Sequence, residues 1–349
     1  MASTDLIGWF ADITLADRPT VGGKGGSLGE LTRAGIAVPG GFVVRTGAFE
    51  RLIVALEREA PLRAVVEALA PDDLDGITRV SKQLLERVTA AALPAELLAE
   101  LRTAHASLCA GNPNAPLAVR SSATTEDAED ASFAGLQDTY LWVMGVSEVE
   151  RQLRHCWASM YSVPSIAYRR SRALPEGGVA MAVVVQRMVD ARTAGVMFTR
   201  SPTTGDRSVI VIEGAWGLGS AVVSGEVTPD RFVVGKITGE ISVREVSDKH
   251  IQHLPRETGG TVECETPAAQ RNEPCVSDAE LMQLRELGRK IERHYGRPQD
   301  IEWAIDREQR LLILQSRPET VWSAKEAVPV SAPRENPLQH VMSVFGGRR

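Results

Sequence analysis

Cysteines are few in this chain and are not spaced as a motif. Cys109, Cys156, Cys264 and Cys275 are the only four in 349 residues, and they form no C-x-x-C pair. A small secreted fold held together by disulfides would need more cysteines over a shorter length. We therefore expect four reduced thiols in a cytoplasmic protein.

The sequence also lacks an excess of positive charge and long hydrophobic runs. Its net charge is −6, so bulk electrostatics favour neither nucleic acid nor an anionic membrane as a partner. No apolar run approaches the roughly 20 residues of a membrane span. The segment Met1–Asp5 has no basic region followed by an apolar core, so we expect no signal peptide. Any bound anion must be held by a local cluster of residues.

What remains is ordinary for a soluble globular enzyme, with 43% hydrophobic and 24% charged residues. The length allows two domains or one large two-lobed domain. Composition changes near residue 178, from Ala/Leu/Glu-rich helical patterns to Val/Ile-rich segments separated by turn residues. We therefore predict an α+β fold with an N-terminal lobe at 1–178 and a C-terminal lobe at 179–320. Residues 321–349 are predicted to be a linker and a tail that could dock another chain.

A glycine-rich stretch, Val21–Glu30, is the first candidate for chemistry. Four glycines flank Lys24, and a helix is predicted from Ser27 to Ala34, with Gly35 as its stop. Glycines let backbone N–H groups approach an anion, and a helix N-terminus and a lysine add positive charge. The stretch matches neither a Walker A loop nor a dinucleotide fingerprint. A phosphate site and an ordinary glycine-rich turn both remain open for it.

Helix starts are predicted from capping residues. Thr46 is a suitable N-cap after the predicted strand Val38–Arg45. Ser147 with Glu150, and Ser277 with Glu280, fit the capping-box pattern. The second of these boxes predicts a helix that ends near Tyr295.

Cations and carboxylates recur on predicted strands further along the chain. Arg120 ends the predicted strand Leu117–Ser122, and a guanidinium is suited to bidentate phosphate contacts. Asp300 and Glu302 share one face of a predicted strand, since their spacing is i, i+2. Gln315 and Arg317 have the same spacing on the next one.

If these two strands pair as a hairpin, the four side chains can converge. Oxygen ligands beside an arginine would suit Mg²⁺ and a polyphosphate. A hairpin that carries only surface salt bridges is the alternative.

Many segments in a fixed order resemble the nucleotide-binding domain of the phosphoenolpyruvate synthase and pyruvate phosphate dikinase family. The resemblance covers about residues 5–320. The segments are Val21–Glu30, Val119–Tyr140, Cys156–Ser159, Gln186–Val189, Gly195–Pro202, Gly217–Gly219, Asp300–Trp303 and Gln315–Pro318. Within the family, the chain most resembles the stand-alone ATP-binding subunit of phenylphosphate synthase and related phenol-phosphorylating enzymes.

This resemblance implies an ATP-grasp-type fold with ATP held between two lobes. It assigns phosphate binding to Lys24, Arg120 and Arg317, and closure of a loop over the phosphates to Gly135 and Thr139. It also assigns adenine contacts to Gln186, Met188 and Val189, and Mg²⁺ ligation to Glu302 and Gln315, with Asp300 nearby. Catalysis would then consist of positioning and charge stabilisation by these groups.

One family feature is missing from the sequence. The resemblance implies that phosphate passes from ATP to a histidine in a T-x-H context on a swivelling domain. The six histidines here, His105, His155, His250, His253, His294 and His340, lack such surroundings. We therefore expect an ATP-binding subunit of a split dikinase, active only with a histidine-bearing partner subunit and acting on a phenol-type acceptor.

Three alternatives stay open. The chain could be the ATP-binding part of a phosphoenolpyruvate synthase or rifampicin phosphotransferase whose other domains lie elsewhere, although Met1 and the tail beyond Pro318 argue against simple truncation. It could be a non-catalytic ATP-sensing module. It could also be a carboxylate–amine ligase, which the V-R-S-S and Q-S-R-P motifs disfavour. In the tail, Leu338, Val341, Met342 and Phe345 fit one face of a short helix that packs on its own domain or docks a partner.

Overall fold

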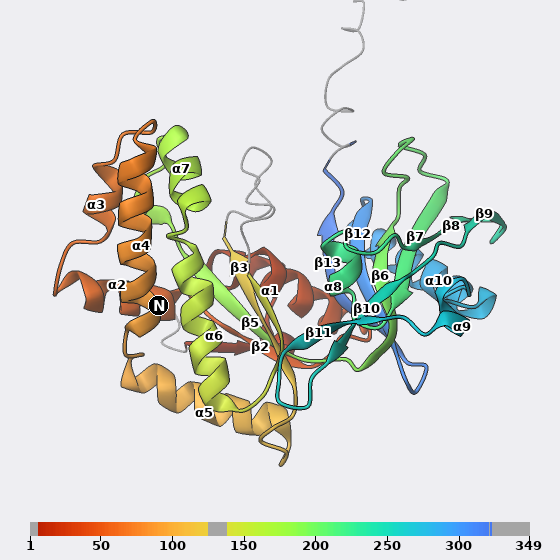
Figure 1. Ribbon diagram of the computed structural model, residues 1–349, viewed down its shortest axis with the longest axis horizontal. Coiled ribbons are helices and arrows are strands. Elements are labelled where there is room, and N and C mark those ends of the chain that lie inside the picture. Colours follow the sequence, from red (N-terminus) through yellow and green to blue (C-terminus); the bar gives the residue numbers. More distant parts are fainter. Residues whose placement is uncertain (1–5, 125–137, 321, 323–349) are drawn as a thin grey trace, which may run out of the picture.

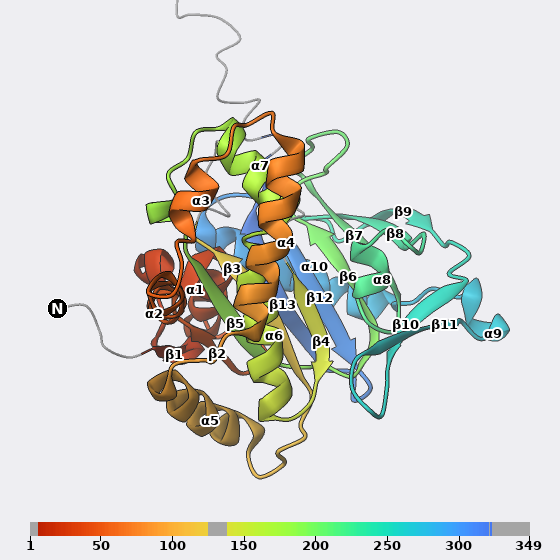
Figure 2. The same cartoon turned by 60° about the vertical axis from the view of Figure 1, so that its left-hand side comes forward.

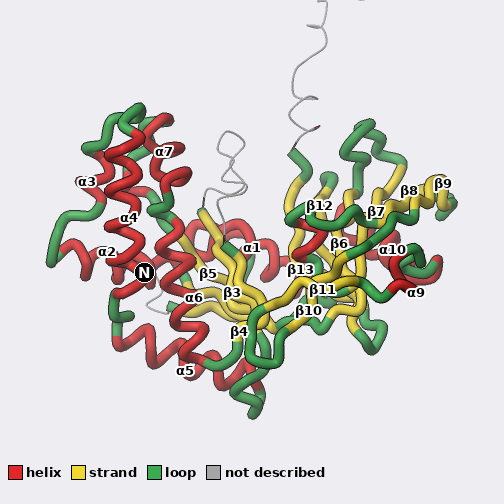
Figure 3. Tube along the Cα trace, in the orientation of Figure 1, coloured by secondary structure: helices red, strands yellow, loops and turns green. Residues whose placement is uncertain are grey.

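The computed structural model describes residues 6–124, 138–320 and 322. These residues form a mixed helix-and-sheet structure with two lobes, each built on its own antiparallel sheet (Figure 1). Helices gather in the N-terminal lobe, and strands dominate the C-terminal lobe (Figure 3). Within the described ranges, no helix has the length and apolarity needed to cross a membrane.

The N-terminal sheet has five strands in the order β1-β2-β5-β3-β4. In chain order they are β1 (Ile7–Trp9), β2 (Gly41–Val44), β3 (Leu117–Ala123), β4 (Thr139–Val143) and β5 (Met181–Arg187). Side chains of β5 alternate between two cores, because successive residues of a strand face opposite sides. Val183 and Val185 face the helical side, and Ala182 and Val184 face the opposite side.

Helices cover the two faces of this sheet. The outer face is packed by α2 (Thr46–Glu57), α3 (Arg63–Glu67), α4 (Leu74–Ala90), α5 (Ala95–Cys109), α6 (Val146–Ser159) and α7 (Val163–Ser171). The turned view shows α4 and α6 in front of β3 and β5 (Figure 2). Trp157 of α6 is fully buried there, and its indole N–H donates to the Met181 carbonyl at 3.1 Å. A large apolar ring with a satisfied polar atom anchors the helix layer.

The inner helix α1 (Arg18–Arg33) lies between the lobes. Its Leu28 belongs to the core against the N-terminal sheet, and its Leu31 belongs to the C-terminal core. The Ser27 hydroxyl donates to the Ser316 carbonyl of the C-terminal sheet at 2.6 Å. One helix therefore packs against both lobes.

The C-terminal sheet has six strands in the order β13-β12-β6-β7-β8-β9. They are β6 (Ala191–Phe198), β7 (Val209–Trp216), β8 (Asp230–Gly235), β9 (Ile241–Glu245), β12 (Gln299–Asp306) and β13 (Leu311–Pro318). Helix α10 (Asp278–Tyr295) covers one face through Leu281, Leu284 and Ile291. The opposite face carries α8 (Ser220–Val223), and the short α9 (Ala268–Arg271) precedes α10.

A separate hairpin links the lobes at one edge. It consists of β10 (Ile251–Pro255) and β11 (Thr261–Glu265), and the sequence patterns did not predict it. Its turn reaches β4 of the N-terminal lobe, where Gly260 N–H donates to the Trp142 carbonyl at 3.0 Å (Figure 1). Three short 3₁₀ turns complete the described elements: η1 (Phe10–Asp12), η2 (Leu15–Asp17) and η3 (Glu176–Gly178).

Local predictions had mixed outcomes. The box of Ser277 and Glu280 is confirmed, with Gly296 left-handed at the end of α10. The box of Ser147 and Glu150 is wrong, because the N-cap of α6 is Gly145, two residues before Ser147. Thr46 is also not a cap but the first residue of α2, after Arg45.

The glycine-rich stretch is helical rather than an open loop. Helix α1 already begins at Arg18 and is interrupted at Gly22, whose φ is 72°. The interruption brings the helix close to β3, because a Cβ at Gly22 would lie 2.2 Å from the Ser122 carbonyl oxygen. The predicted start at Ser27 is therefore wrong, whereas the stop at Gly35, with φ 65°, is confirmed.

The composition change at residue 178 precedes a strand of the first sheet. Strand β5 is hydrogen-bonded between β2 and β3, so its residues pair within the N-terminal sheet. Backbone pairing, rather than composition, decides which sheet a strand joins. We propose that the lobe boundary follows Arg187.

Candidate functional site

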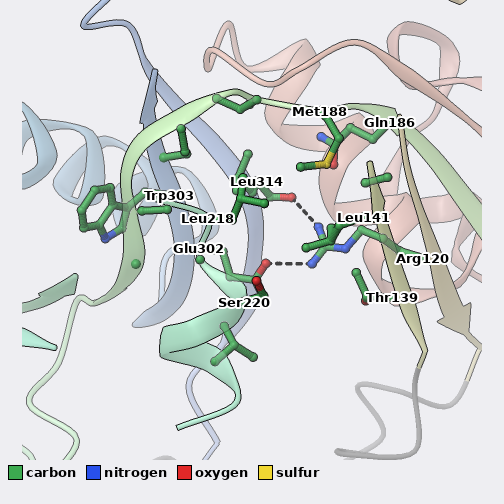
Figure 4. A pocket seen from close by; sticks show the side chains of 18 of the residues that line it. Arg120, Thr139, Leu141, Gln186, Met188, Leu218, Ser220, Glu302, Trp303 and Leu314 are labelled. Carbon is green, nitrogen blue, oxygen red and sulfur yellow. Dashed lines mark hydrogen bonds and ion pairs between the residues drawn. The ribbon is translucent and has the colours of Figure 1, made fainter. Parts of the chain in front are cut away.

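A cavity of about 290 Å³ lies between the two sheets. Its size is near the lower end for small-molecule sites, and its wall is mostly apolar with a few polar groups. Figure 4 shows Arg120, Thr139 and Gln186 on the N-terminal side and Leu218, Glu302 and Leu314 on the C-terminal side. Both lobes therefore contribute side chains to one pocket.

Arg120 crosses from one lobe to the other inside this pocket. It is 7% exposed on β3, and its Nη2 donates to Glu302 Oε2 and to Gln315 Oε1, each at 2.7 Å. Its Nη1 donates to the Leu314 carbonyl at 3.0 Å. All three acceptors belong to the β12–β13 hairpin. The guanidinium is thus fixed by charge-assisted hydrogen bonds, the strongest class between protein groups.

The predicted pairing of the last two strands is confirmed. Glu302 lies opposite Gln315 and Asp300 lies opposite Arg317, with a bulge after Glu302. Residues directly opposite in an antiparallel pair share a face. The four side chains nevertheless divide into two pairs. Glu302 and Gln315 both accept from Arg120, and of the four residues Glu302 alone lines the pocket.

Asp300 is held in an unusual environment. Its Oδ2 lies 3.4 Å from Arg317 Nε, and its buried Oδ1 has no hydrogen-bond donor among the residues that the structure describes. Burial raises the pKa of Asp300 to about 6, and the nearby Arg317 only partly opposes this. Arg317 itself has a side chain that is 55% exposed.

The oxygen atoms on this hairpin fit a hard cation. Glu302, Gln315 and Asp300 offer carboxylate and amide oxygens, the ligand types that Mg²⁺ prefers. The Arg120 guanidinium donates to both Glu302 and Gln315, so the positive charge of an arginine already bridges these two side chains. The unpartnered Asp300 oxygen is a further acceptor on the same hairpin.

The residues predicted to contact adenine follow one another along the pocket wall. Gln186 is buried at the end of β5 and donates from Nε2 to the Pro39 carbonyl at 3.2 Å. Met188 and Val189 line the pocket just after the strand. Leu218 and Leu314 face them from the C-terminal lobe (Figure 4). This end of the pocket therefore combines apolar walls with strand-end polar groups.

The remaining predicted residues are more dispersed. Thr139, at the start of β4, lines the pocket. Lys24 is 8% exposed in α1 and is not among the lining residues. It follows the kink at Gly22, where Gly25 N–H donates to the Ser122 hydroxyl at 3.2 Å. Gly135 lies outside the described residues, as does the predicted tail helix.

Several lining residues were not predicted from sequence. These are chiefly Leu141, Leu218, Ser220 and Leu314. Leu218 stands inside a quoted G-L-G motif, but nothing in that motif indicated a role. Leu314 and Gln315 are neighbours on a strand, so only the fold could show that both reach the same site.

Comparison with known proteins agrees with this geometry. Residues 18–337 match the family described as "Pyruvate phosphate dikinase, AMP/ATP-binding domain". The chain belongs to this family. The predicted family resemblance is therefore confirmed, and so is the expectation of an ATP-binding domain.

Two curated relatives with different names are both similar to this chain. A probable phosphoenolpyruvate synthase of Methanothermobacter thermautotrophicus is 42% identical over 316 residues, which is 90% of this chain and 46% of that protein. A rifampicin phosphotransferase of Streptomyces sviceus is 41% identical over 320 residues, or 90% of this chain and 36% of that protein. The chain thus spans less than half the length of these relatives.

Two solved structures were also compared. The D-cycloserine synthetase DcsG shares 13% identity with a TM-score of 0.24, covering 76% of this chain and 72% of that one. The D-alanyl-alanine synthetase A of Vibrio cholerae shares 11% identity with a TM-score of 0.24, covering 69% and 54%.

Proposed function

We propose that this chain binds Mg-ATP between two lobes of an ATP-grasp-type fold and phosphorylates a histidine on a partner subunit. The observation that carries the proposal is the contact of Arg120 with Glu302 and Gln315 across the lobes. A guanidinium suited to phosphate and side-chain oxygens suited to Mg²⁺ meet there, beside a pocket with an apolar end. Membership of an AMP/ATP-binding family supports the same ligand.

The residues that line the pocket have proposed roles that follow from their positions. Gln186, Met188 and Val189 bind the base against Leu218 and Leu314. Arg120 donates to phosphate oxygens in place of the carboxylate and amide that it now contacts. Such preorganised donors stabilise charge that develops during phosphoryl transfer.

Further residues of both lobes complete the proposed site. Lys24 and Arg317 supply further positive charge toward the phosphates, and Thr139 contacts them from β4. Glu302 and Gln315, with Asp300 nearby, hold the metal. When bound, Mg²⁺ neutralises phosphate charge and orients the chain of phosphates.

The transfer needs a histidine from another chain. Among the described residues, His105 and His155 lie in α5 and α6, and His294 pairs with Glu30 at 2.7 Å. None of the described histidines lines the pocket. A carrier histidine splits one difficult transfer between distant sites into two simpler steps.

The proposed reaction moves the β-phosphoryl group of ATP to a histidine and releases AMP and inorganic phosphate. A partner imidazole nitrogen bonds to the β-phosphorus as the bond from that phosphorus to the α–β bridging oxygen breaks, and AMP leaves with the oxygen. Water then bonds to the γ-phosphorus as the bond from that phosphorus to the β–γ bridging oxygen breaks. Inorganic phosphate departs, and the bridging oxygen stays on the β-phosphate. The phosphate left on the histidine passes to an acceptor hydroxyl, which releases its proton.

A phenol-type acceptor is our first candidate, by resemblance to phenylphosphate synthase. The names of the relatives support two alternative activities, phosphoenolpyruvate synthesis and rifampicin phosphorylation. These acceptors would be bound by other domains or subunits, so they share the ATP chemistry described above.

Label transfer separates the proposal from its alternatives. The chain is incubated with Mg²⁺ and ATP labelled at the β- or γ-phosphate, with and without a partner protein that carries a T-x-H histidine. We expect AMP only with the partner, β-label on the partner histidine and γ-label in inorganic phosphate. ADP release by the chain alone would indicate a direct kinase. ATP binding without turnover under any partner condition would indicate a sensing module.

A further inference from the structure

A hydrogen-bonded chain of three side chains reaches the pocket from the outside. Ser220, the first residue of α8, lines the pocket, and its hydroxyl lies 2.8 Å from Nδ1 of His253. Nε2 of His253 lies 2.9 Å from a carboxylate oxygen of Glu226. We call Ser220, His253 and Glu226 the serine–histidine–glutamate chain. None of the three was predicted to be functional.

The backbone holds the histidine in place. The His253 carbonyl accepts from Leu218 N–H at 2.9 Å. Gly217 also forms an isolated parallel β-bridge with His253. Gly217 has φ +75°, and a Cβ there would lie 2.5 Å from the His253 carbonyl oxygen. The hairpin β10–β11 is thereby attached directly to the segment that enters α8.

If the imidazole is neutral, the acidic groups around it determine which ring nitrogen carries hydrogen. Glu263 lies opposite His253 on β11, and the ligand atoms of Glu226, His253 and Glu263 all lie within 4.8 Å of one another. Ionised carboxylates only accept hydrogen bonds, so Nε2 must donate. In the neutral imidazole, Nδ1 then accepts, and the Ser220 hydroxyl donates to it.

This arrangement gives the pocket a directed acceptor. When the Ser220 hydroxyl donates to a neutral His253, its oxygen offers only lone pairs to a ligand. A complementary ligand group is a hydroxyl that donates. Figure 4 shows Ser220 on the wall that carries Glu302, across from Gln186 and Arg120.

A nucleotide has such hydroxyls between its two ends. The base end of the pocket is the wall of Gln186 and Met188, and the phosphate end is the group around Arg120. Three small polar side chains line the pocket, Thr139, Ser220 and Ser224. Ser224 donates only weakly to the carbonyl of Ala221 in its own helix, at 3.4 Å.

We propose that Ser220 binds a ribose hydroxyl of the nucleotide and that His253 is the positioning residue that orients it. The site would thereby select ribonucleotides over deoxyribonucleotides. This inference rests on the proposed function, because it assumes that the pocket holds ATP.

The test measures affinity for ATP, 2′-deoxy-ATP and 3′-deoxy-ATP by calorimetry with Mg²⁺ as the only added divalent cation. The protein is first stripped with a chelator. Variants are Ser220→Ala, His253→Ala, and His253→Asn, whose amide can still accept near the Nδ1 position. Ser242→Ala is the control, because Ser242 donates to the Val233 carbonyl and does not line the pocket. Circular dichroism checks that each variant is folded.

We expect the wild-type chain to prefer ATP over at least one deoxy analogue by about tenfold, the ratio for one hydrogen bond. Ser220→Ala and His253→Ala should reduce this ratio to near one by weakening ATP alone. Ser242→Ala should keep it, and His253→Asn should restore part of it.

Three outcomes would overturn the inference. A ratio in Ser220→Ala equal to that of the wild type, with ATP still bound, would remove the ribose contact but leave the proposed function intact. Discrimination that appears only after Zn²⁺ is added would mean that Glu226, His253 and Glu263 bind a metal, which reverses the polarity of Ser220. Failure of the wild-type chain to bind ATP would overturn both this inference and the proposed function.

Discussion

Arg120 Nη2 lies 2.7 Å from the Glu302 carboxylate, although the two residues are 182 positions apart and belong to different sheets. The contact joins a cation from the N-terminal lobe to an oxygen ligand from the C-terminal lobe. A polyphosphate in the pocket would compete with Glu302 for Arg120. Nucleotide binding should therefore exchange one charge-assisted contact for another.

Glu302→Gln tests the proposed metal ligand. The amide keeps the size of the side chain but removes the negative charge, so we expect phosphotransfer to fall about 100-fold or more with little loss of folding stability. The measurement is the rate of AMP formation against Mg²⁺ concentration. Glu308→Gln is the control, since Glu308 is 68% exposed in the turn of the same hairpin. Equal losses in both variants would contradict a specific role for Glu302.

Arg120→Ala and Lys24→Ala test the proposed phosphate cations. We expect each to reduce phosphotransfer about 100-fold, and Arg120→Lys to recover only part of the loss because a point charge cannot make the same forked contacts. ATP affinity and AMP formation are measured together. Arg307→Ala, at an exposed pair with Asp190, serves as the control. Full activity of Arg120→Ala, Lys24→Ala and Glu302→Gln would sink the site assignment.

Gly22→Ala tests the kink in α1. A Cβ there would lie 2.2 Å from a backbone carbonyl, so we expect a cost of about 3 kcal/mol or more in unfolding free energy. Gly35→Ala is the matched control. It also has positive φ, but nothing lies within 4 Å of its Cβ, so strain alone should cost about 1 kcal/mol. Denaturant unfolding of both variants gives the comparison, and similar losses would mean that the close approach to β3 is unimportant.

Lys249→Met tests a buried ion pair that supports the C-terminal lobe. Lys249 and Asp230 have fully buried side chains 2.6 Å apart, and Asp230 also accepts from Cys275 N–H at 2.8 Å. Removing the lysine leaves a buried carboxylate without its cation, at a cost of about 3–5 kcal/mol. Arg231→Met, which loses a more exposed pair with Glu245, should destabilise the protein much less. Unfolding midpoints that shift equally would contradict this expectation.

His105→Gln tests a pH dependence of stability. Burial lowers the pKa of His105, so the native state disfavours its protonated form. The stabilising contribution is complete above the unfolded histidine pKa of about 6.5 and is lost as pH falls through the lower native pKa. The wild type should therefore lose more unfolding free energy than the variant between pH 7 and pH 5. The interval from pH 7 to pH 8 is the internal control, and parallel curves below pH 7 would refute the prediction.

The two pairs on the last hairpin illustrate what a sequence pattern can predict. The i, i+2 spacing of Asp300 and Glu302, and of Gln315 and Arg317, predicted shared faces, and the strand pairing agrees. The spacing could not show that Arg120 would contact Glu302 and Gln315 and so separate them from Asp300 and Arg317. This contact depends on the position of β3 in the other lobe, and the local spacing of residues along a strand does not determine that position.

The missed and mistaken elements have the same physical cause. The helix through the glycine-rich stretch is stabilised by packing of Leu28 and Leu31 against two cores, which outweighs the low helix propensity of glycine. The hairpin β10–β11 has no buried face of its own, since its residues are half-buried or exposed. It therefore lacks the apolar alternation by which strands are recognised.

The sequence alone determined the family, the order of helices and strands in broad outline, and the residue types that a Mg-ATP site requires. These follow from local chemistry: charge, spacing and the conformational preferences of glycine and of capping residues. Only the tertiary structure decided that Arg120 meets Glu302 and Gln315, that Leu218 and Leu314 form the apolar wall, and that Ser220 is held by His253. Such contacts join distant segments, and their geometry is fixed by how the two sheets and α1 pack together.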